Sequence, residues 1–205
     1  SVFDSFGRLE IAPLLPKFNH LYPSAKVALS LDNSVVDLYN SDVDICIRHG
    51  KPNDSNLIMK QLVKDQVKLV ASPQYIAENE TIYHPEHLKN HDCLTFHRQR
   101  QHAFWHFKQG NEQLKIKVTG GLSSCGGEPM IQWAKEGIGL TLMSHWCIKK
   151  ELEKGELVEV MPEWKPQLNE SNSTQIYMVW PPGATQIPVV RHLIDFISDS
   201  LRLNN

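Results

Sequence analysis

The stretch that decides the fold is IQWAKEGIGLTLMSHWCIKKELEKGELV, residues Ile131 to Val158. It predicts an apolar helix, a Gly-x-Gly turn, a buried strand and a second helix that follow one another directly along the chain. The turn at Gly137 and Gly139 is best explained by close packing of the helix on the strand, because glycine lets another backbone approach. Helices and strands that alternate in this way indicate an α/β domain.

Two further blocks precede it, VVDLYNSDVDICIRHG at residues 35–50 and LVASPQYI at residues 69–76. In this order and spacing the three blocks resemble the effector-binding domain of LysR-type transcriptional regulators. The resemblance covers nearly the whole chain, from FGRLEIAPLLPKFNHLYP at residues 6–23 to IYMVWPP at 176–182 and PVVRHLIDFI at 188–197. It implies that the chain senses a ligand and is not an enzyme.

The resemblance also implies a two-lobed, periplasmic-binding-protein-like α/β fold. Lobe I would comprise residues 1–66 and 175–205, and lobe II residues 67–174, with two crossover strands joining them. Each lobe should hold a mostly parallel sheet flanked by helices. A complete regulator of this family also carries a winged helix-turn-helix and a linker helix, which this sequence lacks. We therefore expect contact with DNA only through an N-terminal domain absent from this chain.

The local pattern in lobe I predicts β-α-β-α-β. A helical apolar stripe ends at Leu21, and Pro13 and Pro16 indicate that the regular part of this helix begins late or bends. A strand should follow at Val27–Leu31. We then expect a short helix through Val36 and Tyr39, capped from residues 32–34, and a strand that ends at Arg48.

In lobe II, strands are expected at residues 67–72, 93–96, 114–118, 138–143 and 157–161. Helices are expected at residues 85–89, 128–136 and 146–154, and residues 162–174 read as a loop. Pro188 suits the first turn of the final helix, which carries Val190, Leu193, Ile194, Ile197 and Leu201 on one face.

Composition narrows the function classes. The 205 residues carry a net charge of -2, so the chain has no overall basic character of the kind that DNA-binding domains show. No apolar run reaches the ~18 residues of a membrane span. The four cysteines form no CxxC pair, which favours a reducing compartment, and the cytoplasm is expected. No cofactor is indicated.

The effector should lie in the cleft between the lobes, since ligands of α/β folds bind beyond strand ends and beside helix starts. Hydroxyls and free N–H groups at helix amino ends favour a small anionic ligand. The expected ligand-binding residues are Phe3, Ser5, Arg48, Phe96, His97, Ser123 and Ser124. Alternatively, the serines only cap helices, and Arg48 forms a structural ion pair with a neighbour such as Asp44.

Three further sequence features bear on redox, metal and catalytic chemistry. Cys125, in a loop before a helix, is a possible redox-sensing thiol, against an inert small residue. His84, His87, His91, His97, His102 and His106 lie close in sequence, but no HExxH or cysteine pair accompanies them, so no metal is expected. No Gly-x-Ser-x-Gly elbow or P-loop points to catalysis.

The predicted function is therefore the ligand-sensing regulatory domain of a LysR-type regulator, which would relay effector binding to DNA-binding domains through oligomer rearrangement. The resemblance implies a homodimer or tetramer that pairs through the first helix, around residues 9–22. The alternative is a free-standing solute-binding protein of a transport system, which shares the two-lobed architecture.

Overall fold

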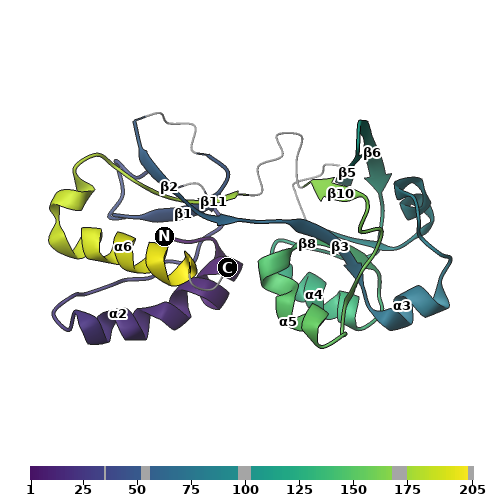
Figure 1. Cartoon of the computed structure of the whole chain (residues 1–205), viewed down its shortest axis with the longest axis horizontal. Helices are drawn as coiled ribbons and strands as arrows, with labels where there is room; N and C mark the ends of the chain where they lie inside the picture. The colour runs from purple at the N-terminus through teal and green to yellow at the C-terminus, as the bar shows by residue number, and fades with distance from the viewer. Residues whose placement is uncertain (35, 52–55, 97–102, 168–174, 203–205) are drawn as a thin grey trace. The chain divides into compact units, whose positions relative to one another are not determined.

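A computed structural model of the chain describes residues 1–34, 36–51, 56–96, 103–167 and 175–202. The chain packs as two compact units, shown in Figure 1. Unit 1 comprises Ser1–Lys64 and Gln175–Asn205, and unit 2 comprises Asp65–Thr174. Unit 1 is thus built from two separate segments of the chain, and unit 2 from one.

The sheet of unit 1 has the order β1-β11-β2, with β1 at Cys46–His49, β11 at Gln175–Trp180 and β2 at Ile58–Lys64. Both pairs are antiparallel. Parallel pairing among the described residues of this unit is limited to single bridges of Val2 with Leu31 and Ile47. The expected mostly parallel sheet is therefore wrong here, because the returning strand β11 enters between β1 and β2 and runs against both.

The first helix is irregular, as the two prolines predicted. It runs through α1 (Asp4–Phe6), a π-helical turn (Gly7–Ile11), a 3-10 turn (Ala12–Leu14) and α2 (Leu15–Leu21). The amide of Ala12 donates to Gly7 O, and the amide of Leu15 donates to Ala12 O. Pro16 has no N–H to offer the carbonyl of Ala12, so a tighter turn takes its place.

The long final helix α6 (Pro188–Arg202) begins at Pro188, as predicted. Its apolar face buries Val190, Ile194, Ile197 and Leu201. Phe196 meets Phe18 of α2 with ring centroids 5.3 Å apart, so the first and last helices pack together. A short 3-10 turn at Ala184–Gln186 leads into α6.

Two predicted elements of unit 1 are wrong. Only Leu31 of the expected strand 27–31 pairs, as an isolated bridge. Residues 38–42 form bends, and none of residues 36–42 is helical. Here the Asp37 carboxylate accepts hydrogen bonds from the amides of Tyr39 and Asn40 at 2.9 and 3.2 Å. A side chain that satisfies nearby amides in this way offers the backbone an alternative to a helical turn.

The main sheet of unit 2 has the order β7-β4-β8-β3-β9. The strands are β3 (Val67–Ala71), β4 (Cys93–Phe96), β7 (Ser123–Ser124), β8 (Leu140–Ser144) and β9 (Val158–Glu159). β4 pairs in parallel with β7 and β8, whereas β3 pairs antiparallel with β8 and β9. The sheet is therefore mixed, which corrects the mostly parallel expectation again. The antiparallel strand β3 is the first strand of unit 2 along the chain.

Helices cover the sheet of unit 2. They are α3 (Pro73–Glu78), the 3-10 helix at Pro85–Asn90, α4 (Gly127–Lys135) and α5 (His145–Glu153). One buried cluster joins the sheet to α4 and α5, and its members are Val70, Leu94, Met130, Ala134, Met143, Ile148 and Leu157. The 3-10 helix, α4 and α5 lie close to the predicted positions, whereas α3 was not predicted.

A second, three-stranded antiparallel sheet completes unit 2, in the order β10-β5-β6. It consists of β5 (Ala103–Gln109), β6 (Glu112–Val118) and β10 (Lys165–Gln167), labelled in Figure 1. One face buries Trp105, Phe107, Ile116 and Val118 in the larger core of the unit. The expected loop 162–174 thus contains a strand, and its residues 168–174 lie outside the described part.

The Gly-x-Gly turn does contain a close backbone approach, but it lies between two strand starts and not, as predicted, between the helix and the strand. A Cβ built on Gly139 would lie 2.4 Å from the carbonyl oxygen of Asp92, so only glycine permits this approach at the start of β8. Gly137 has φ +77°, a left-handed conformation that ends the helix before it. Gly139 thereby lets the start of β8 lie against the residue that precedes β4.

Candidate functional site

In unit 1, two of the predicted ligand-binding residues, Phe3 and Ser5, lie at the start of the first helix. Phe3 occupies the N-cap position and makes no side-chain capping bond, so the alternative of Ser5 as N-cap is wrong. The Ser5 side chain is half-buried and finds no hydrogen-bond partner within the described ranges.

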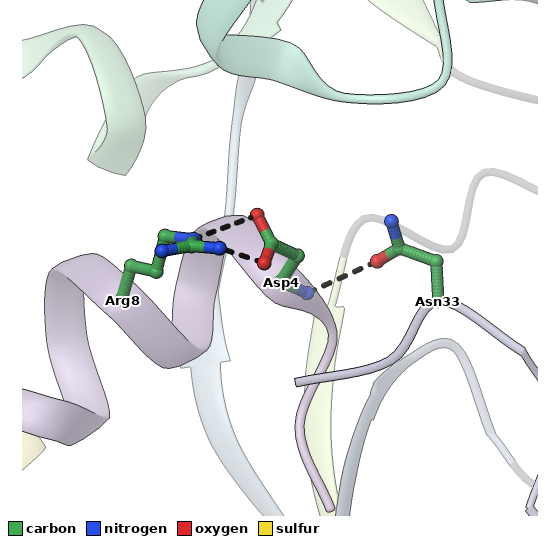
Figure 2. A network of polar contacts seen from close by, with 3 residues as sticks. All are labelled: Asp4, Arg8 and Asn33. Atoms are coloured by element: carbon green, nitrogen blue, oxygen red, sulfur yellow. Dashed lines mark hydrogen bonds and ion pairs between the residues drawn. The ribbon is translucent and has the colours of Figure 1, made fainter. Parts of the chain in front are cut away.

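A polar network beside Ser5 was not predicted from the sequence (Figure 2). Arg8 Nε donates to both carboxylate oxygens of Asp4, at 2.9 and 3.1 Å. The amide of Asp4 donates to Asn33 Oδ1 at 3.0 Å, which ties the helix start to a segment 29 residues away. The i,i+4 spacing of Asp4 and Arg8 could have signalled the ion pair. Nothing in the sequence signalled the contact with Asn33.

Phe3 packs against the end of β1. Its ring centroid lies 4.4 Å from that of His49 and 5.3 Å from that of Phe6. Partial loss of hydration lowers the pKa of His49 to about 4, so its imidazole is neutral at pH 7. The structure thus brings Phe3 to the strand end that carries Arg48, and adds a neutral aromatic donor or acceptor there.

Arg48 is half-buried and largely engaged within unit 1. Nη1 donates to Ile47 O at 2.8 Å, and Nη2 donates to Ser1 Oγ at 2.8 Å and to Ser34 O at 3.3 Å. Its structural partners are thus a hydroxyl and backbone carbonyls, and not Asp44. An anion bound at Arg48 would compete for a guanidinium that already donates a hydrogen bond to the carbonyl of Ser34.

In unit 2, the β4–β7 pair brings three predicted residues together. Thr95 lies opposite Ser123, and Phe96 lies opposite Ser124. Phe96 is 39% exposed and Ser123 is exposed, so both face solvent in this unit. The pair leads directly into the helix α4, whose N-cap residue is Gly126. His97 and Arg98, which the sequence placed beside Phe96, lie outside the described residues.

The capping interpretation fits Ser124 in part. Its Oγ accepts a hydrogen bond from the amide of Gly126 at 3.1 Å, just before α4 begins. Gly126 itself has no side chain to cap the helix. The first turn of α4 contains Glu128. Ser124 thus shapes the turn, while Ser123 presents an exposed hydroxyl at the same strand end.

The four cysteines are free thiols. Burial raises the pKa of Cys93 and of Cys147 to about 12, and it raises the pKa of Cys46 as well. Cys125 is exposed, two residues before the start of α4. If any of these thiols reacts with an oxidant in solution, Cys125 has the access to do so.

Three histidines of the sequence cluster, His84, His87 and His91, contact aromatic side chains. His84 meets Trp164 edge-on at 5.1 Å, His87 meets Tyr83 at 4.3 Å, and His91 Nδ1 lies 3.2 Å from the hydroxyl of Tyr75. Within the described ranges, no group of three or more His, Cys, Asp or Glu side chains is placed to hold a metal ion. His102, which the sequence paired with His106, lies outside those ranges.

Two compact α/β units, one built from both ends of the chain and one from its middle, define the class of two-lobed, periplasmic-binding-protein-like domains. The chain belongs to the LysR substrate binding domain family, whose model matches residues 1–202. None of the described helices combines the length and apolar character needed to cross a bilayer.

Known relatives agree with this assignment. The chain is 36% identical over 165 residues to the HTH-type transcriptional activator TtdR of Escherichia coli K12, covering 80% of this chain and 53% of that protein. It is 36% identical over 166 residues to the HTH-type transcriptional regulator DmlR of the same strain, covering 80% and 54%. The chain thus spans about half the length of these curated relatives.

Solved structures show the same fold. Full-length AphB of Vibrio cholerae, described as a virulence activator of the LTTR family, matches with a TM-score of 0.83 and 26% identity, over 97% of this chain and 66% of that one. CrgA of Neisseria meningitidis matches with a TM-score of 0.83 and 23% identity, over 98% and 68%.

Proposed function

We propose that this chain is the ligand-sensing regulatory domain of a LysR-type transcriptional regulator and has no catalytic role. The observation that carries the proposal is the family match over residues 1–202, together with relatives named as transcriptional regulators. In the intact protein, DNA would be bound by an N-terminal domain outside this chain. A cytoplasmic location follows from this role and is part of the proposal.

The proposed effector is a small anion, such as a carboxylate. In unit 1, the half-buried hydroxyl of Ser5 and the guanidinium of Arg48 support this chemistry, with Phe3 as an apolar wall. In unit 2, the exposed Ser123 hydroxyl beside Ser124, Phe96 and the start of α4 supports it, because helix amino ends and hydroxyls donate to anions. His97 stays a candidate on the sequence alone.

The test is a thermal-shift screen of this chain with a panel of small carboxylates and inorganic anions. A ligand that binds only the folded state should raise the melting temperature in proportion to its concentration above Kd. Calorimetry on a hit then compares Ser5→Ala and Ser123→Ala, one in each unit, with the exposed control Ser24→Ala. Loss of a hydrogen bond to a charged ligand should cost about 1.5 to 3 kcal/mol in each site variant.

Arg48→Ala should weaken the same hit by about 1.5 to 3 kcal/mol. Because Arg48 also holds Ser34, the variant needs a circular dichroism check that it is folded. If the site variants, folded, bind the hit as tightly as the parent chain, the proposed residues are wrong.

A free-standing solute-binding protein is the alternative function. The names of the relatives disfavour it, and so do four free thiols, which suit a reducing compartment. The coding sequence upstream of residue 1 separates the two: a helix-turn-helix supports the regulator, whereas a signal peptide supports transport.

Relay to DNA would use an oligomer, a homodimer or a tetramer. The first helix supports this, since Leu9 and Leu21 are 50% and 56% exposed, and a closed twofold pair would bury such side chains. An effector would shift the oligomer only by its differential affinity for two states, typically ~1 to 3 kcal/mol. Light scattering should show a dimer that Leu21→Glu disperses and Lys26→Glu does not. A monomer at high concentration would refute the pairing.

A further inference from the structure

The outer face of the β10-β5-β6 sheet collects positive charge. Along β5 and β6, side chains alternate between the buried core and solvent. The register places Phe104 opposite Lys117, His106 opposite Lys115, and Lys108 opposite Lys165 of β10. Residues directly opposite one another share a face. This face, called the lysine face below, comprises Phe104, His106, Lys108, Lys115, Lys117 and Lys165.

Three lysines of the lysine face carry positive charge without a carboxylate partner among the described residues. Lys108, Lys117 and Lys165 form no ion pair with a carboxylate in the described part of the chain. The nearest acids in sequence do not occupy its outward register positions: Glu112 lies beside the hairpin turn and Glu163 precedes β10. In a chain whose net charge is -2, this is a local concentration of one sign.

The arrangement carries a stability cost that an anion would relieve. Lys108 and Lys165 lie directly opposite each other on adjacent strands, where like charges destabilise the pair. The sheet beneath them is held firmly, since Trp105 and Phe107 are 7% and 1% exposed. The lysines therefore cannot separate by moving the strands, and a bound polyanion would offset their repulsion.

We infer that the lysine face binds the phosphate backbone of duplex DNA. The partner is polyanionic because several lysines cover the face and no outward position carries an acid. A duplex suits it better than a single strand, because single strands bind by stacking bases on exposed aromatic rings. Phe104 is the exposed ring here, and Lys115 Nζ already lies over it, 5.0 Å from its centroid.

An acidic protein segment is the rival partner. Amphipathic acidic peptides anchor several apolar side chains in a groove, whereas the lysine face offers a single apolar ring, that of Phe104, with Lys115 Nζ over it. Lysine serves phosphates as a point charge that needs no particular geometry. The inference goes beyond the proposed function, which leaves DNA to another domain, and does not depend on it.

The test is a titration of this chain, labelled with ¹⁵N, with a short duplex of arbitrary sequence at low salt. Amide shifts should change at residues 103–118 and 165–167 and not in unit 1. For three to four phosphate contacts, a fourfold rise in salt should weaken binding roughly 40- to 150-fold. Changes confined to other residues, or no changes, would overturn the inference.

Charge variants make the test specific. Lys117→Glu with Lys165→Glu should abolish the shifts at low salt, whereas Lys17→Glu with Lys26→Glu, two exposed lysines of unit 1, should leave them. Both pairs change the net charge equally, so an equal loss would refute a specific face. Equal or tighter binding of a single strand, or of polyglutamate, would refute the duplex as partner. Thermal melts establish that each variant is folded.

Discussion

Ser124 Oγ accepts a hydrogen bond from the amide of Gly126 at 3.1 Å, at the point where β7 turns into α4. Ser123 lies next to it on the same short strand and is exposed. The two neighbouring serines therefore differ in what their hydroxyls do in the folded chain. Ser124 holds the turn, whereas Ser123 offers its hydroxyl to solvent.

Ser124→Ala should destabilise the folded chain by about 0.5 to 1.5 kcal/mol, the net value of one hydrogen bond. Ser123→Ala should change stability by less than about 0.5 kcal/mol, as exposed substitutions usually do. Urea unfolding of both variants measures the difference. Equal effects would mean that the Ser124 turn bond contributes nothing to stability.

The glycine turn gives a prediction with an internal control. Gly139→Ala would place a Cβ 2.4 Å from the carbonyl oxygen of Asp92 and 3.0 Å from its carbon, so backbone must move. The cost should be about 1 to 3 kcal/mol. Gly121→Ala meets nothing within 4 Å and should be close to neutral. Thermal melts of the two variants should differ clearly, and equal melting temperatures would contradict the close approach.

The elements around residues 131–158 and the final helix could be predicted because their patterns are long and the turn chemistry is specific. The strand direction could not, because β11 pairs with strands more than a hundred residues away in sequence. The expected helix at residues 36–39 failed because the Asp37 carboxylate satisfies the amides that a helix would have used. Such local competition is invisible to hydrophobic periodicity.

The candidate site was predicted only in part. Strand pairing brings Phe96, Ser123 and Ser124 together, as strand ends and helix starts suggested. The partners of Arg48 could not be predicted, since they are backbone carbonyls and Ser1, which carry no sequence pattern. The same holds for Asn33, whose contact with Asp4 depends on the path of a loop.

The four thiols should react in a definite order. Cys125 is exposed, while Cys46 and Cys93 are buried and burial raises the pKa of both, as it does for Cys147. Iodoacetamide on the native chain should therefore label Cys125 first, and the other three only on unfolding. Mass spectrometry of a time course shows the order. Early labelling of Cys46 or Cys93 would contradict their burial.

A mild oxidant tests whether Cys125 also senses redox state. Peroxide should convert Cys125 to a sulfenic acid that dimedone traps, and Cys125→Ser should abolish the trapping. If Cys125 stays unmodified while the chain is folded, the redox interpretation is wrong and the residue is an ordinary loop side chain.

Asp65, 6% exposed, should make stability depend on pH. Burial raises the pKa of its carboxyl to about 6, although hydrogen bonds from Ser144, Trp146 and the amides of Gln66 and His145 oppose the rise. The folded state therefore holds a proton that the unfolded state has released between pH ~4 and ~6. Stability from this group is present below pH ~4, falls as pH rises to ~6, and is constant above that.

Asp65→Asn keeps an acceptor oxygen and cannot ionise. The variant should gain about 2 to 3 kcal/mol over the parent at pH 7, from a pKa difference of about two units, and almost nothing below pH ~4. Urea unfolding of both chains at several pH values gives the difference, in which the histidine contributions cancel. Ser144→Ala removes one hydrogen bond that lowers the pKa of the Asp65 carboxyl, so the pKa should rise further. The pH range over which the free energy of unfolding falls should then extend to higher pH. A difference between Asn variant and parent that does not change with pH would mean that Asp65 titrates as it does in water.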